Sequence, residues 1–163
     1  AASDVYKRQE LKADEVFDLF QKEYRNVCGP YRLKNYKITE EKNEDDYLTK
    51  VHFTGELKYK DNEPVKIEGV GSGPVGAFCD AMNKTPLREY EFIDYDEHSI
   101  SVGSDSKAIS YIQLKTPQGK TIFGIGVSHN IGYACMKGVI CAINRDQADT
   151  MRDDTMPGIF DVC

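Results

Sequence analysis

The sequence predicts an α+β fold in which two β-β-β-α units are related by a pseudo-twofold axis, with mainly antiparallel sheets packed against two helices. Three observations support this prediction. Segments with alternating apolar and polar residues occur in groups of three, which is typical of half-buried strands. Each group precedes a segment with helical periodicity. Finally, Gly69-Val70-Gly71 recurs 55 residues later as Gly124-Ile125-Gly126. Since a repeated unit needs its twin to bury its apolar face, we expect one shared core.

The first unit is expected over residues 31–84. Its predicted strands are a segment containing Leu33, Tyr36 and Ile38, then Leu48–Tyr59, then Val65–Glu68. A helix is predicted from Pro74 to about Asn83, because proline suits the first turn of a helix. The apolar residues of this helix recur every three or four positions and form one face: Val75, Phe78, Cys79 and Met82. Thr85-Pro86 is expected to end it.

The second unit is expected over residues 87–145 and repeats this order. Its predicted strands are Leu87–Tyr95, Ala108–Thr116 and Thr121–Gly124, with a polar loop over Asp96–Lys107. The helix that follows has apolar residues from Ile131 to Ile143. Both helices close on the same pattern, Ala81-Met82-Asn83 and Ala142-Ile143-Asn144. Together the two units form a predicted domain over residues 31–145.

The two ends of the chain are expected to lie outside this domain. Residues 1–9 match nothing that follows and are interpreted as a non-native or disordered leader. Residues 10–25 read as an amphipathic helix with Leu11, Val16, Leu19 and Phe20 on its apolar side, and Cys28-Gly29-Pro30 ends it. The segment 10–30 therefore leads into the domain. Residues 146–163 are polar and are predicted to be a mobile tail.

Composition limits the classes of function. The chain has 163 residues, a formal net charge of −6 and a pI of about 5.1, which argues against nucleic acid or an anionic membrane as partner. It contains no apolar run approaching the roughly 20 residues of a membrane span. Its five cysteines form no C-x-x-C pair, which favours reduced thiols over disulfides or a zinc site. We therefore expect no cofactor or metal in this chain.

The glycine-rich stretch from Gly69 to Gly76 is expected to form a turn with positive φ angles that opens a helix. Free N–H groups and the helix dipole make such a turn a candidate anion site. Gly71-x-Gly73-x-x-Gly76 also matches the dinucleotide-binding pattern, with Asp94 and Asp96 about 20 residues further on. The strands alternate, however, whereas parallel Rossmann strands are continuously apolar. A purely structural turn and a small anion such as a carboxylate remain the alternatives.

A catalytic site is not indicated. The histidines His52, His98 and His129 lie in no pattern typical of a nucleophile–base pair or a zinc site. The acidic residues Asp94, Asp96 and Glu97 form a cluster that is more typical of a solvated loop than of acid–base chemistry.

Several motifs in order resemble a known family: Gly71-Ser72-Gly73-Pro74-Val75, Asp94-Tyr95-x-Glu97-His98, Gly103-x-Asp105, Tyr111-Ile112 and Gly124-Ile125-Gly126. Over roughly residues 31–145 the chain resembles the C-terminal regulatory domain of 2-isopropylmalate synthase, and residues 10–28 resemble the end of the linker subdomain. The resemblance implies a parent enzyme that condenses acetyl-CoA with 3-methyl-2-oxobutanoate, using a divalent metal in a TIM barrel. The metal-binding His-x-His of that barrel is absent, so we expect no catalysis from this chain alone.

The resemblance further implies a cytoplasmic homodimer, attached to the catalytic barrel, that binds L-leucine at the dimer interface for feedback inhibition of leucine biosynthesis. Helix N–H groups suit the carboxylate of an amino acid, and carbonyls or an acidic side chain suit its ammonium group. The residues at positions that match the family's pocket are Gly73, Val75, Gly76, Phe92, Tyr95, Ser99, Ser106 and Ile131.

Three of these residues depart from the family pattern. Ser99 and Ser106 stand where relatives often have alanine, and Phe92 stands where an aliphatic residue is common. These departures leave three alternatives: isoleucine sensing, as in a citramalate-type synthase; a dimerisation scaffold without amino-acid sensing; and, on the glycine pattern alone, a small nucleotide-binding enzyme.

Overall fold

The computed structural model describes residues 29–42, 49–99 and 106–154, with only the backbone for the last four of these. The described elements are β1 (Tyr31–Glu41), β2 (Lys50–Tyr59), β3 (Val65–Gly71), α3 (Pro74–Asn83), the 3-10 helix η1 (Pro86–Glu89), β4 (Glu91–Ser99), β5 (Ala108–Lys115), β6 (Thr121–Ser128) and α4 (Ile131–Asp154). The expected leader and linker helix lie outside the described residues.

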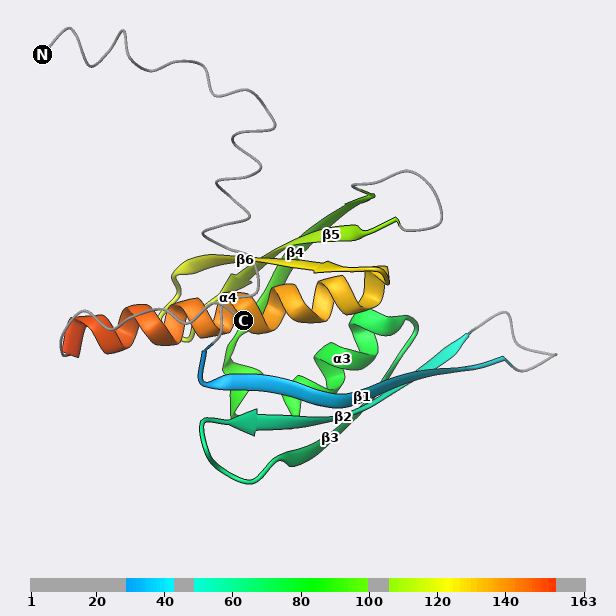
Figure 1. The fold of residues 1–163 in the computed structure, drawn as a ribbon, viewed down its shortest axis with the longest axis horizontal. Coiled ribbons are helices and arrows are strands. Elements are labelled where there is room, and N and C mark those ends of the chain that lie inside the picture. Colours follow the sequence, from blue (N-terminus) through cyan, green and yellow to red (C-terminus); the bar gives the residue numbers. More distant parts are fainter. Residues whose placement is uncertain (1–28, 43–48, 100–105, 155–163) are drawn as a thin grey trace, which may run out of the picture.

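The strands form two separate three-stranded sheets, in the orders β1-β2-β3 and β4-β5-β6, and every pairing is antiparallel. Helix α3 follows the first sheet and α4 follows the second. Both helices lie between the two sheets in Figure 1. The predicted α+β fold with two β-β-β-α units is therefore confirmed. None of the described helices combines the length and the apolar character needed to cross a membrane.

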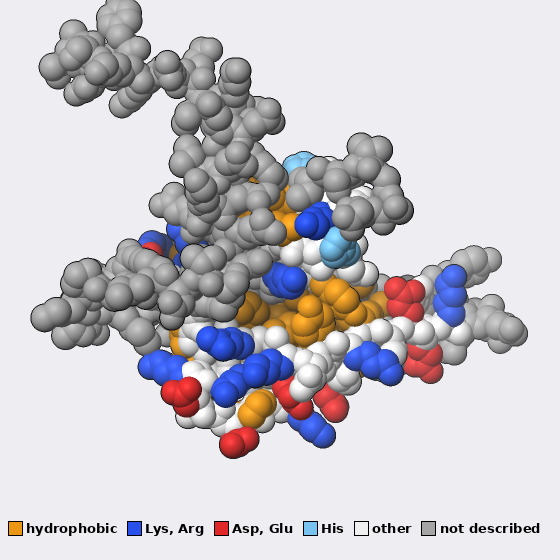
Figure 2. All heavy atoms as spheres, in the orientation of Figure 1, with side chains coloured by type: hydrophobic (Ala, Val, Ile, Leu, Met, Phe, Trp, Pro, Cys, Tyr) orange, Lys and Arg blue, Asp and Glu red, His pale blue; other side chains and the backbone are white. Residues whose placement is uncertain are grey.

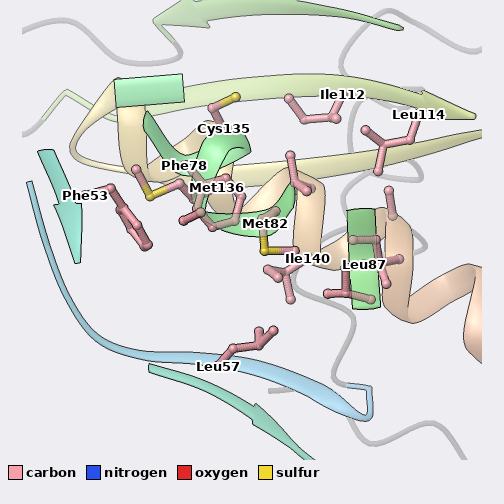
Figure 3. Close-up of a cluster of buried hydrophobic side chains, with 14 of the residues drawn as sticks. Phe53, Leu57, Phe78, Met82, Leu87, Ile112, Leu114, Cys135, Met136 and Ile140 are labelled. Carbon is pink, nitrogen blue, oxygen red and sulfur yellow. The ribbon is translucent and has the colours of Figure 1, made fainter. Parts of the chain in front are cut away.

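One core joins the two units, as expected from the repeat. It contains Phe53 and Leu57 from the first sheet, Phe78 from α3, and Ile112 from the second sheet, all of them buried. Figure 3 shows these side chains converging with Cys135, Met136 and Ile140 of α4. The rings of Phe53 and Phe78 meet edge to face, with centroids 5.2 Å apart. Because both helices contribute to this core, neither unit would bury its apolar surface alone.

The recurring glycines lie inside strands, which corrects the expected turn. Gly69 and Gly71 belong to β3 and Gly124 and Gly126 to β6, and among described glycines only Gly119 has a positive φ. A Cβ atom at any of these four strand positions would collide with the backbone of the following helix. The glycines therefore allow each helix to pack closely against its own sheet.

Helix α4 extends to Asp154, so residues 146–154 of the expected tail are helical. The physical reason lies in buried polar contacts. Asp146 is only 8% exposed and accepts a 2.7 Å hydrogen bond from the Tyr90 hydroxyl, and Gln147 donates to the same hydroxyl. The polar composition of this segment predicts a tail, whereas Asp146 and Gln147 form hydrogen bonds to Tyr90, the residue just before β4. Residues 155–163 lie outside the described part.

Smaller differences concern strand ends. β4 continues to Ser99, within the segment expected to be a loop, and β6 continues to Ser128 instead of ending at Gly124. The predicted strand start at Leu87 falls in η1, where the Thr85 hydroxyl accepts from the Leu87 N–H.

Candidate functional site

The start of α3 carries no side-chain cap. Gly73 is its N-cap residue, in an extended conformation, and its carbonyl accepts the first helical hydrogen bond from the Ala77 N–H at 3.0 Å. Pro74 has no N–H, so the donors at this end are the N–H groups of Val75 and Gly76. A Cβ atom at Gly73 would meet nothing within 4 Å. The positive end of this helix dipole is therefore accessible to a small anion.

The start of α4 differs, because Asn130 caps it. The Asn130 Oδ1 atom accepts a hydrogen bond from the Tyr133 N–H at 3.3 Å. The two helix starts also meet, since a Cβ atom at Gly132 would lie only 2.9 Å from the Cβ atom of Pro74. Ile131, the first residue of α4, is 49% exposed and is placed beside the start of α3 by this contact.

A bulge in β4 brings two predicted site residues to one face. Phe92 pairs with Leu114 and Tyr95 pairs with Ile112, and the register shifts between Phe92 and Asp94. Leu114 and Ile112 belong to the core beneath α4, so Phe92 and Tyr95 also lie on the helix-facing side of the sheet. Their ring centroids are 5.9 Å apart. Tyr95 remains 43% exposed, so this part of the face is open in a single chain.

Glu97 lies on the same face, two residues after Tyr95, and pairs with Ser110. Burial raises the pKa of the Cys135 thiol in α4 to about 12, with the nearby Cys79 thiol and Glu97 carboxylate adding to the rise while Ser110 opposes it. Glu97 therefore lies on the side of the sheet against which α4 packs. Glu97 is thus on a strand and not in the charged loop predicted from the sequence, and the two-residue alternation from Tyr95 is the signal that indicates this.

Ser99 and Ser106 lie at the same end of the second sheet as Ile131. Ser99 pairs with Ala108, which pairs in turn with Ser128 just before α4. Both serines are exposed, and Ser106 stands two residues before β5. The residues between them, 100–105, lie outside the described part of the chain.

Two cavities bordered by described residues do not enclose the predicted set. One, of about 260 Å³, lies between α3 and β4 and takes in Phe92 alone of the eight; its other apolar lining includes Phe78, Met82 and Leu114. The second, of about 680 Å³, lies between β2, β3 and η1 and contains none of the eight. Neither of these two cavities therefore gathers the eight predicted residues.

Other kinds of site find little support in the described residues. The antiparallel sheets are incompatible with a Rossmann fold, so the dinucleotide reading of the glycine pattern is wrong. His98 lies on the opposite face of β4, where its ring contacts Tyr111 and its Nε2 atom is 3.3 Å from Asp96. Among the described cysteines, Cys79, Cys135 and Cys141 form no disulfide. No group of three or more potential metal ligands occurs among the residues that the structure describes.

Comparisons with known proteins agree with the resemblance seen in the motifs. Residues 10–146 match the family model described as LeuA allosteric (dimerisation) domain. The chain is 42% identical over 144 residues to a 2-isopropylmalate synthase from Clostridium acetobutylicum, covering 85% of this chain and 24% of that protein. It is 35% identical over 143 residues to the enzyme from Brucella suis, covering 84% and 24%, and 32% identical over 136 residues to that from Acetoanaerobium sticklandii, covering 83% and 23%. The chain spans about a quarter of the length of these relatives.

Proposed function

The chain belongs to the family of LeuA allosteric (dimerisation) domains, and on this basis we propose that it senses L-leucine as the regulatory part of a 2-isopropylmalate synthase. One observation carries the proposal: the uncapped start of α3 meets the start of α4, which packs on the sheet face that carries Phe92 and the partly exposed Tyr95. A free amino acid with an apolar side chain needs both features.

The carboxylate of the ligand would bind at the start of α3. The N–H groups of Val75 and Gly76 have no side-chain acceptor there, and the helix dipole favours a negative charge. A charge-assisted hydrogen bond of this type is worth about 1.5–3 kcal/mol. Gly73 leaves room for the carboxylate because it places no side chain in front of these donors.

The rest of the ligand would lie against β4 and α4. Glu97 is the acidic side chain on the helix-facing side of β4 and would pair with the ammonium group. Phe92, Tyr95 and Ile131 would surround the side chain of the ligand. Since one methylene group in an apolar pocket discriminates by only about 1–3 kcal/mol, isoleucine and valine are expected to bind as weaker competitors.

A second copy of the chain would close the site. Tyr95 and Ile131 are both more than two-fifths exposed in a single chain. Pairing through strand edges is disfavoured at β3 and β6, because helix side chains occupy their outward backbone groups: Asp80 accepts from the Val70 N–H, and Arg145 donates to the Phe123 carbonyl. A dimer is therefore expected to leave the β3 and β6 edges unpaired and to hold the exposed site residues at or near its interface.

The proposed function also implies a reaction and a setting for the parent enzyme. In the proposed setting it condenses acetyl-CoA with 3-methyl-2-oxobutanoate in the cytoplasm, and the catalytic barrel with its divalent metal lies outside this chain. Leucine binding here would then report the level of the pathway's product. The chain itself would carry no catalysis.

Calorimetry on the full chain tests this function. Leucine should bind, with isoleucine and valine weaker, and Glu97→Gln should weaken leucine binding about 10-fold or more through loss of a charged hydrogen bond. Glu68→Gln, an exposed acidic residue on the other sheet, is the matched control and should bind as the unaltered chain does. Sedimentation should show a dimer. A folded dimer that binds none of the three amino acids would refute sensing and support the alternative, a dimerisation scaffold.

A further inference from the structure

The two sheets differ on the faces that point away from the helices. In the first sheet this face is polar, with His52, Thr54 and Glu56 along its central strand. Figure 2 shows lysine, arginine and acidic side chains spread over the region of β1 to β3. In the second sheet the same face carries Ile109, Tyr111, Phe123, Ile125 and Val127, which we call the outer apolar face.

Three of the five residues of the outer apolar face are already covered within one chain, whereas Phe123 is 54% exposed. Ile109, Ile125 and Val127 are only 1%, 2% and 5% exposed. Helix α4 cannot be the cover, because it packs on the opposite side of the sheet, against Gly126 and Ile112. Among described residues, the partly buried hydrophobic side chain packed against these three is Tyr111, which belongs to the same face. The cover is therefore another part of this chain.

The path of the chain indicates which part. Gly29, the first described residue, lies against Asn144 of α4, and both backbone groups of Tyr31 bond to the Asn144 side chain. The next residue of α4, Arg145, donates to the carbonyl of Phe123 on β6. The described chain thus begins against the turn of α4 whose next residue contacts β6, the edge strand of the second sheet.

The preceding segment has a matching sequence. Val16, Leu19, Phe20 and Val27 recur at helical spacing and share one side of a helix, while Asp18 and Arg25 fall on the opposite side. A helix of twelve residues is about 18 Å long. The three strands of the sheet are about 10 Å across, measured between the outer two, so such a helix is long enough to cross the sheet. The family match also begins at residue 10, so this segment belongs to the domain.

We propose that residues 16–27 dock as an amphipathic helix on the outer apolar face of the second sheet of the same chain. Docking would attach residues 16–27 to the second β-β-β-α unit. This assignment is independent of the ligand, because the outer apolar face and the helix starts lie on opposite sides of the second sheet.

Photo-crosslinking of the full chain tests the docking. Phe20 is replaced by p-benzoylphenylalanine, and ¹⁴N- and ¹⁵N-labelled chains are mixed in equal amounts before irradiation. The expected products join residue 20 to peptides containing Ile125 or Val127 of the same isotope. The same probe at position 18, on the other side of the helix, should give at least 10-fold fewer of these products. Crosslinks between isotopes would assign the face to a second copy, and crosslinks elsewhere or equal yields at both positions would also overturn the proposal.

Trypsin provides a second measurement that does not need the probe. Docking should protect the bonds after Lys22 and Arg25 under native conditions. Phe20→Asp should raise their cleavage rate about 10-fold or more, whereas Asp18→Ala should leave it unchanged. Circular dichroism melting confirms that each variant is folded. Equal cleavage of Phe20→Asp and the unaltered chain would overturn the proposal.

Discussion

Asn144→Ala should destabilise the domain strongly, because this side chain ties the start of β1 to α4. The Asn144 Oδ1 atom accepts from the Tyr31 N–H and its Nδ2 atom donates to the Tyr31 carbonyl, both at 2.9 Å. The residue is 1% exposed. Removing it breaks two hydrogen bonds and leaves two backbone groups without these partners, at about 1–2 kcal/mol each. We expect a loss of about 3 kcal/mol in the free energy of unfolding.

The repeat supplies a matched control for this experiment. Asn83 occupies the corresponding position in the Ala-x-Asn pattern that closes α3, but it is exposed. Asn83→Ala should therefore change stability by no more than about 0.5 kcal/mol. Urea unfolding measures both variants, and a 3 kcal/mol loss corresponds to a melting temperature lower by roughly 10 °C. Equal effects of the two substitutions would refute the role given to the Tyr31–Asn144 contact.

Three further predictions concern packing and pH. Gly126→Ala should lower the free energy of unfolding, measured with urea, by about 3 kcal/mol or more, because the new Cβ atom would collide with the α4 backbone at Ala134. Gly73→Ala should leave the free energy of unfolding nearly unchanged, because the space at its Cβ position is open. Burial, together with the nearby Asp146 carboxylate, raises the pKa of Tyr90 above 10.0. The contribution of Tyr90 to folding stability is therefore complete below pH 10 and is lost as pH rises further. Tyr90→Phe should remove this contribution to the loss of stability at alkaline pH. Hydrogen bonds from Lys84 and the Val70 N–H lower the pKa of Asp80 below 3.8, so its contribution is lost as pH falls below that value. An NMR titration of Lys84→Met should find the Asp80 pKa raised toward 3.8, and an unchanged value would contradict this cause.

The order of elements could be predicted from the sequence because it depends on local periodicity. Alternation along Leu48–Tyr59 and helical spacing after Pro74 are visible without any knowledge of what packs against them. The repeat of Gly69-Val70-Gly71 then paired the two units. The predicted role of those glycines is wrong. A positive φ and a close helix contact both favour a residue without a Cβ atom, and the sequence alone does not distinguish them.

The differences between the two units could not be predicted in the same way. Asn83 and Asn144 occupy equivalent positions, yet only Asn144 meets the returning start of β1. This contact joins residues 113 positions apart, so no local pattern encodes it. The extension of α4 to Asp154 has the same origin, since the burial of Asp146 depends on Tyr90 in another element. The place of Glu97 on a strand likewise depends on how far β4 continues.

Duplication gives the proposed site a physical basis. A single β-β-β-α unit offers a helix start with free N–H groups, but its own strands lie behind that helix and cannot form an apolar wall in front of it. In the pseudo-twofold arrangement the start of α3 comes from the first unit, and Phe92, Tyr95 and Glu97 come from the second. Because Asn130 caps α4 while Gly73 leaves α3 uncapped, one of the two helix starts retains open donors. Under the proposed function, the pair of units would therefore bind one amino acid asymmetrically, even though each unit is built in the same way.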